Sequence, residues 1–318
     1  MKQTNNAIKF LMAQYRAVFK HAYLASLGAS LVAATAMDDA AFKAHTGPEL
    51  VIGGDGATYN KLTLTAALAD SAAKDVNIIL KAGESTFLGV AAVTSPAPDT
   101  PAKTNLDLSA ATLDINQAAP ATTAKLTVGD GTNAVKVKLE GLTVTKGTLE
   151  LNGTAKANAT LETGSITVGA AANPAPSQPD AVVKIGAGGV LGKTGAKITV
   201  NTNGKISASG EGAKLIGNVA ISGGTVAADN SLTIEGDLTA TAGALTTTSG
   251  KTATITGNAT FKGAETLTNS GTLLIQGAAE FADGSVKEST GTVTFGKTAS
   301  MNAATLKAML SGTTVKSA

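Results

Sequence analysis

Residues of the types that carry out catalysis are few in this chain, and their spacing forms no catalytic motif. Asp107 and Asp114 stand seven residues apart in the segment LDLSAATLDI. A general acid and a general base must be matched in space, and this spacing does not predict such a pair. We therefore expect both residues to be solvated carboxylates at strand ends.

Histidine and cysteine supply no metal site and no nucleophile. Beyond residue 36 the sequence has one histidine, His45, and the whole chain has no cysteine. Because His45 precedes Gly47-Pro48 in an expected linker, we interpret it as solvated. A zinc site or a catalytic triad needs partners that no motif supplies. The sequence thus predicts no catalytic, metal-binding or cofactor-binding residue.

Two glycine-rich segments superficially match ligand-binding loops. They are Gly53-Gly54-Asp55-Gly56 and Gly129-Asp130-Gly131. The first lacks the Lys and the Ser or Thr of a nucleotide-binding loop, and the acidic turns do not recur every nine residues as calcium-binding repeats do. We interpret both segments as turns that use the conformational freedom of glycine.

The charge of the chain argues against nucleic acid as a partner. The formal net charge is +2, but four of the 25 basic residues lie in the first 36 residues, where there is no Asp or Glu. The remainder carries 21 basic and 23 acidic residues and has no arginine. Such a near-neutral body lacks the basic patch of a nucleic-acid-binding protein.

Residues 1–36 have the layout of a secretory signal. A long basic segment precedes the apolar run YLASLGASLVAATA, which ends on Ala34-Thr35-Ala36. This small-x-small ending predicts cleavage before Met37. The apolar run has about 14 residues, fewer than the roughly 20 that a spanning helix needs, so we expect no transmembrane segment in the mature chain.

The C-terminal part repeats with a period of about 20 residues, which is typical of stacked coils. Four stretches, residues 231–250, 252–271, 272–291 and 292–312, align with Lys251 as a spare residue. Apolar residues recur in three columns: Ile234, Ile255, Ile275 and Phe295; Phe261, Phe281 and Met301; Leu245, Leu267, Val286 and Leu306. Leu232, Ala253, Leu273 and Val293 alternate with the first column at strand spacing. The sequence predicts an all-β solenoid with three sides and roughly 20 residues per coil.

The remaining segments suggest caps and loops around these coils. We expect a linker and capping segment over residues 37–82, with a short helix around Leu64 and Leu68, and coils over residues 83–300. The Pro-rich segments Ser95–Pro101 and Asn173–Pro179 predict projecting loops, because proline cannot donate to a strand ladder. Residues 301–318 predict a helical cap, with Leu306, Met309 and Leu310 folded onto the last coil, and a polar tail that frays.

The order strand, helix, strand in ELVIGGDGATYNKLTLTAALADSAAKDVNIILKAGESTF, from Glu49 to Phe87, resembles the N-terminal cap and first coil of right-handed parallel β-helix proteins of the pectin-lyase-like superfamily. The long leader resembles those of autotransporters and related surface proteins of Gram-negative bacteria. The first resemblance implies a right-handed β-helix with a short N-terminal capping helix. It also raises an enzyme hypothesis, since many members of that superfamily cleave or de-esterify acidic polysaccharides.

Without arginine beyond residue 36, the chain lacks the guanidinium that such lyases and esterases commonly use, and lysine does not replace it at a bidentate site. We therefore expect a secreted or cell-surface protein that is not an enzyme: a structural or adhesive shaft, similar to autotransporter passengers and filamentous adhesins. Its expected partners are host surfaces, glycans, matrix or neighbouring proteins, and a separate outer-membrane translocator. A secreted carbohydrate-active enzyme and a subunit of a filament or surface lattice remain as alternatives.

Overall fold

The computed structural model describes residues 35–54, 57–68, 74–90, 93–95, 97–100, 104–117, 124–170, 180–310 and 314–317. It divides the chain into two units, Met1–Thr35 and Ala36–Ala318. Every described helix and strand belongs to the second unit. The predicted leader, residues 1–36, lies outside the described residues except for its last two positions.

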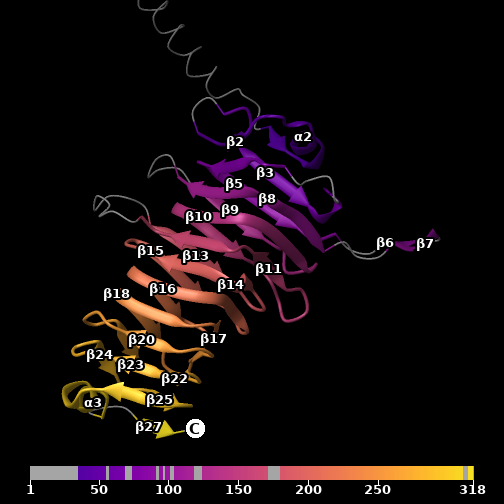
Figure 1. The fold of residues 1–318 in the computed structure, drawn as a ribbon. Helices are drawn as coiled ribbons and strands as arrows, with labels where there is room; N and C mark the ends of the chain where they lie inside the picture. Colours follow the sequence, from indigo (N-terminus) through magenta and orange to yellow (C-terminus); the bar gives the residue numbers. More distant parts are fainter. Residues whose placement is uncertain are drawn as a thin grey trace, which may run out of the picture. The chain divides into compact units, whose positions relative to one another are not determined.

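The second unit is built from parallel strands that follow one another as stacked rungs, from indigo β2 to yellow β25 in Figure 1. Their pairings form three parallel series, which we call ladders A, B and C. Several long strands turn corners and contribute to more than one ladder; β10, for example, pairs within all three. This arrangement is consistent with the β-solenoid that the sequence predicts.

Ladder A begins the unit and runs through most of it. Its strands, in order of pairing, are β1 (Ala36–Met37), β3 (Lys61–Thr65), β5 (Gly83–Leu88), β9 (Ala124–Val128), the end of β10 (Val135–Leu151), β13 (Ala181–Ile185), β15 (Gly204–Ala208), the ends of β16 (Ala213–Ala228) and β18 (Leu238–Thr247), β21 (Leu267–Asn269) and β24 (Val286–Ser289).

Ladder B is formed by the strands that come just before the ladder A strand of the same rung in the sequence. Its strands are β2 (Glu49–Ile52), β4 (Asn77–Leu80), the second half of β8 (Asn105–Asn116), the middle of β10, β12 (Ser165–Val168), the second half of β14 (Val190–Val200), the middle of β16, the start of β18, β20 (Ala259–Phe261), β23 (Ala279–Phe281) and β26 (Ala299–Met301).

Ladder C starts later in the chain. Its strands are the first parts of β8 and β10, β11 (Ala159–Glu162), the first parts of β14 and β16, β17 (Leu232–Glu235), β19 (Thr252–Ile255), β22 (Thr272–Ile275), β25 (Thr292–Phe295) and β27 (Thr314–Ser317). In the first two rungs a helix follows the ladder A strand and precedes the ladder B strand. These helices are α2 (Asp39–Ala44) and η1 (Ala66–Leu68). These two helices contact each other, and η1 contacts β8.

The predicted 20-residue register is confirmed. Ile255 pairs with Ile234 on one side and with Ile275 on the other, and Ile275 pairs with Phe295. Phe261, Phe281 and Met301 form the second column, and Leu245, Leu267 and Val286 the third. The burial pattern of β19 alternates as predicted, because Ala253 and Ile255 are buried and Thr254 is half-buried.

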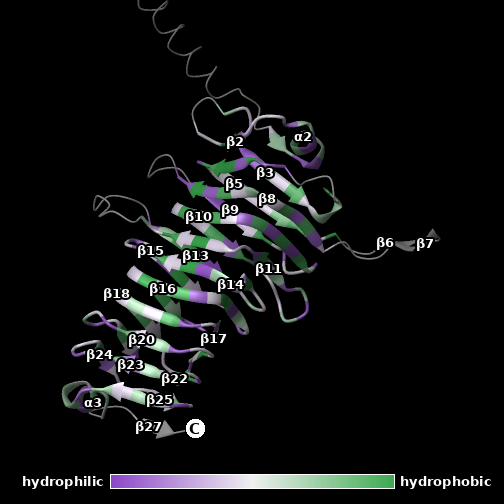
Figure 2. Cartoon of the chain, in the orientation of Figure 1, coloured by the Kyte–Doolittle hydropathy of each residue, from purple (hydrophilic) through white to green (hydrophobic). Residues whose placement is uncertain are grey.

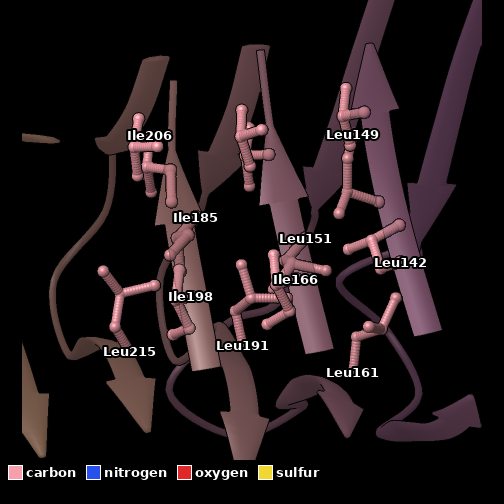
Figure 3. Packing of buried hydrophobic residues seen from close by; sticks show 14 of the residues in the cluster. Leu142, Leu149, Leu151, Leu161, Ile166, Ile185, Leu191, Ile198, Ile206 and Leu215 are labelled. Carbon is pink, nitrogen blue, oxygen red and sulfur yellow. The ribbon is translucent and has the colours of Figure 1, made fainter. Parts of the chain in front are cut away.

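The interior is filled by the inward residues of all three ladders. Figure 3 shows leucine and isoleucine side chains from successive strands meeting between them, among them Leu142, Leu151, Ile166 and Ile198. Figure 2 shows the corresponding alternation of green and paler residues along the strands. Dispersion and burial of these apolar side chains stabilise the stack.

The helix predicted around Leu64 and Leu68 is found only in part. Lys61–Thr65 is strand β3, with Leu62 and Leu64 buried and Thr63 half-buried. Ala66–Leu68 forms a 3-10 helix, and residues 69–73, which follow it, lie outside the described residues. The period-two alternation of KLTLT places two leucines in the core as a strand, which outweighs the helical preference of the following alanines. The α-helix lies instead at Asp39–Ala44, where Phe42 is buried.

The C-terminal segment differs from the prediction in two ways. Leu306 is not in the third column but on helix α3 (Ala303–Leu310), where it is 40% exposed. The helix interrupts the column because Asn302 caps it: its Oδ1 accepts a hydrogen bond from Thr305 N at 2.8 Å. Met309 is buried, as expected. The segment Thr314–Ser317 does not fray but pairs with β25 as strand β27.

Of the two predicted loops, the first contains a hairpin and the second lies outside the described residues. Strands β6 (Val93–Ser95) and β7 (Ala97–Thr100) pair in an antiparallel manner in the first Pro-rich segment. Residues 171–179 contain the second segment. The helices in the described part of the chain are too short or too polar to serve as a membrane span.

Candidate functional site

The two carboxylates singled out in the sequence lie on different ladders. Asp107 belongs to ladder C, where it pairs in register with Lys138 and approaches its Nζ atom to 3.3 Å. Asp114 belongs to ladder B and pairs in register with Thr143. The structure therefore does not bring the two carboxylates together as an acid and base pair.

The surroundings of the two carboxylates shift their pKa values in opposite directions. Hydrogen bonding with Ser109 and the charge of Lys138 lower the pKa of Asp107. Burial raises the pKa of Asp114, and its hydrogen bonds with Asn116 and Thr145 offset this effect only in part. Asp114 is thus not the freely solvated carboxylate that we expected.

His45 also differs from the expectation of a solvated linker residue. It ends helix α2, its backbone N–H donates to Ala41 O and Phe42 O, and its Nε2 atom is buried without a hydrogen-bond partner. The Nζ atom of Lys74 donates to the carbonyl oxygens of Phe42 at 2.8 Å and His45 at 2.5 Å, and to that of Lys43. These contacts make His45 part of the C-terminal end of helix α2, where Lys74 holds the main chain.

The glycine-rich turn Gly129-Asp130-Gly131 has the geometry of a turn, as predicted. Both glycines have positive φ, 87° and 75°. Asp130 Oδ1 accepts hydrogen bonds from Thr132 N at 2.8 Å and Asn133 N at 2.9 Å, and these bonds lower the pKa of Asp130. In the other segment Gly53 and Gly54 also have positive φ, whereas Asp55 and Gly56 lie outside the described residues.

Charged side chains on ladders A and C pair across adjacent rungs. On ladder A, Lys125 Nζ lies 2.7 Å from Glu150 Oε2. On ladder C, Lys136 and Lys214 each lie 2.7 Å from a glutamate of the next rung, Glu162 and Glu235. Among the described residues, no ion pair involves a residue of ladder B.

Ladder B carries instead a row of short, mostly uncharged side chains on its exposed side. We call this row the B row. In order of register it consists of Val51, Ile79, Asp114, Thr143, Thr167, Thr199, Ala220, Thr239, Thr260, Glu280 and Ser300. Each member is half-buried or exposed. Adjacent members are about 4.8 Å apart, which is the spacing of paired strands.

Within the described part of the chain, shallow hollows lie along ladder B at three places. The first, of about 450 Å³, is lined by Asn77, Thr112, Asp114, Gly141, Thr143 and Ser165, together with two core leucines. The second and third, of about 360 and 320 Å³, lie around Thr239 and around Thr260. The backbone does not require glycine at position 141, because the φ angle of Gly141 is not positive. A Cβ atom added there would meet only Thr112 Cγ2, at 3.7 Å.

Sequence reasoning missed the B row and its first hollow. The columns read from the sequence begin at residue 231, whereas Asn77, Gly141 and Ser165 belong to rungs separated by longer intervals. One signal was present: the exposed position between two inward residues is threonine in several C-terminal repeats, as at Thr260. Within the described ranges no cluster of three or more His, Asp or Glu residues is placed to hold a metal ion.

Comparison of the chain with protein-family models, with curated proteins and with solved structures finds no match. The class is therefore defined by the fold alone. The chain is an all-β protein of stacked parallel strands, consistent with a β-solenoid.

Proposed function

We propose that the chain is an exported surface protein: a right-handed parallel β-helix with three faces whose B row contacts host, matrix, glycan or a neighbouring protein. In this proposal α2 and η1 cover the N-terminal end of ladder C, and a separate outer-membrane translocator delivers the chain to the surface. The mechanism is adhesion through the polar members of the B row, mainly its threonine hydroxyl groups, and no catalytic step is needed.

The observation that carries this proposal is the contrast between the ladders. Exposed charges on ladders A and C meet partners in the adjacent rung, so part of their interaction capacity is used within the molecule. The hydroxyl groups of the B row, such as those of the register partners Thr143 and Thr167, stand at a fixed spacing, and Thr143 lines an open hollow. Rigid, pre-organised polar groups bind with little loss of conformational entropy, which suits a contact surface.

The test compares two matched pairs of substitutions in the exported full chain. Thr143→Arg with Thr167→Arg places two long cations at register partners of the B row. Thr246→Arg with Thr268→Arg places two at register partners on the exposed side of ladder A. Binding is measured to immobilised neutral glycans, acidic glycans, matrix proteins and cell surfaces. The proposal expects the B-row pair to weaken binding at least about tenfold and the ladder A pair to retain it. Equal binding by both pairs would contradict a role for the B row.

The enzyme alternative has one observation in its favour, the raised pKa of Asp114 beside a hollow, since shifted pKa values are frequent at active sites. On ladder B its register neighbours are Ile79 and Thr143, neither of which is a carboxylate. We therefore propose that this hollow contacts a binding partner and does not catalyse a reaction.

A further inference from the structure

The peptide bond at which we expect leader cleavage lies inside the folded unit. Ala36 and Met37 form strand β1, the first strand of ladder A, and pair in register with Lys61 and Leu62 of β3. Met37 is 1% exposed and belongs to the hydrophobic core, whereas Ala36 is exposed. The side chain that follows the scissile bond is thus a core side chain.

The two residues after Met37 are held by hydrogen bonds, Asp38 within helix α2 and Asp39 to the next rung. Asp38 caps helix α2, with its Oδ1 accepting from Ala41 N at 2.9 Å. The carboxylate of Asp39 reaches β3, where it accepts from Thr65 N at 2.9 Å and from Thr65 Oγ1 at 2.6 Å. The hydrogen bond from Thr65 Oγ1 to the Asp39 carboxylate is charge-assisted and short, which places it among the stronger side-chain interactions.

The other end of α2 is held by Lys74. Its ammonium group donates to three carbonyl oxygens at the C-terminal end of the helix, those of Phe42, Lys43 and His45. It also lies 5.7 Å from the centre of the Phe42 ring, and Phe42 is fully buried. The positive charge complements the negative end of the helix dipole and the face of the ring. In Figure 1, α2 lies beside β3.

A peptidase binds the residues around its scissile bond in an extended conformation in its own cleft, so it competes with β3 for β1 and with the core for Met37. We infer that the folded N-terminal rungs protect the Ala36–Met37 bond, so that the leader is removed only before β1, α2 and β3 fold. The inference rests on the proposed export. In the reaction, water adds across the amide, leaving a carboxylate on Ala36 and a free amine on Met37.

Cleavage at this bond is compatible with folding afterwards. It removes Ala36, which is exposed, and leaves Met37 and the whole of α2 on the body. No core side chain is lost. Processing followed by folding therefore gives the complete core, whereas folding followed by processing requires the first rungs to open again.

The experiment uses the full chain and a purified membrane-bound signal peptidase that prefers small-x-small sites. In one arm, chain denatured in urea is diluted directly into peptidase in detergent; in the other, the chain is refolded before peptidase is added. Cleavage is followed by the appearance of a Met37 N-terminus. We expect the refolded chain to be cut at least about tenfold more slowly, because cleavage then tracks the population of the opened state.

Lys74→Ala and Lys43→Ala give a matched pair of variants. Lys74→Ala removes the bonds to α2 at a site remote from the scissile bond, so it should speed cleavage of the refolded chain and leave that of the denatured chain unchanged. Lys43 is exposed and contributes only its main-chain oxygen to this contact, so Lys43→Ala should behave as the parent. Equal cleavage rates in the two arms overturn the inference. Failure of cleavage in both arms overturns the proposed leader processing itself, and the inference with it.

Discussion

At the scale of residues, neighbouring side chains on one strand should respond in opposite ways to the same substitution. Ile255 is fully buried and Thr254 is half-buried on the other side of β19. Ile255→Asp would bury an unpaired carboxylate and lose an apolar contact, at a cost of several kcal/mol, whereas Thr254→Asp should change stability by no more than about 1 kcal/mol. Urea denaturation measures both free energies of unfolding. If Thr254→Asp is as damaging as Ile255→Asp, the alternation is wrong.

The aromatic column gives a second test at this scale. The rings of Phe261 and Phe281 stack with centroids 4.9 Å apart and planes 8° apart, and Phe295 meets Phe281 edge-on at 6.0 Å. Phe281→Ala should cost roughly 3 to 5 kcal/mol, because it leaves a cavity in the core. A double-mutant cycle with Phe261→Ala should show coupling of about 0.5 to 1.5 kcal/mol between the two rings. Additive effects would contradict the stacking.

At the scale of elements, the corner between ladders C and B depends on stacked glycines and on the residues that follow them. Gly257 N donates to Gly236 O, and Gly277 N donates to Gly257 O, each at 3.0 Å. In the same corner Asn258 N donates to Asp237 Oδ1 at 2.7 Å, and Ala278 N donates to Asn258 Oδ1 at 2.9 Å. Each rung thus satisfies backbone N–H groups of the next one at its bend.

This geometry predicts that any side chain at Gly257 destabilises the corner. A Cβ there would lie 2.5 Å from Gly236 O and also against Asp237 Oδ1, so the rungs would have to separate. Gly257→Ala should destabilise the protein by about 1 to 3 kcal/mol. Gly141→Ala is the matched control, because its Cβ has open space and its φ is not positive, and it should be neutral or slightly stabilising. Thermal unfolding of the two variants distinguishes them; equal melting temperatures would refute the role of the corner.

The strands that could be predicted from the sequence are those in successive rungs that contain the same number of residues. Thr252, Thr272 and Thr292 are spaced by 20 residues and pair in register, so the columns could be read directly. Earlier on ladder B, Gly141 and Ser165 are paired although they stand 24 residues apart, and Ser165 pairs with Lys197, 32 residues on. Corners and insertions of varying length remove the fixed period, so the first hollow could not be assembled from spacing alone.

At the scale of the whole molecule, the rungs stack so that each contacts only its neighbours, and a functional carboxylate pair on one face would come from adjacent strands of one ladder or from positions two apart on one strand. Side-chain length and strand spacing then limit the distance between the two groups. Retaining glycosidases need carboxylates about 5 to 5.5 Å apart and inverting ones about 6.5 to 9.5 Å. Asp114 has an isoleucine and a threonine as register neighbours, and Asp107 faces a lysine. On β8 itself, the positions two residues away from either aspartate carry threonine, asparagine or serine and no carboxylate.

We therefore predict that the purified protein does not depolymerise or de-esterify pectin or other acidic polysaccharides, with or without calcium. Without arginine beyond residue 36, no guanidinium is available to polarise a uronate carboxyl group, and Asp114 would repel that group in its ionised form. Reducing ends and released methanol are measured over prolonged incubation. Asp114→Asn and Asp107→Asn serve as a pair of variants, because the first lies in a hollow and the second in an ion pair. Reproducible product formation that Asp114→Asn abolishes and Asp107→Asn leaves intact would make the first hollow an active site and reverse the choice of contact over catalysis.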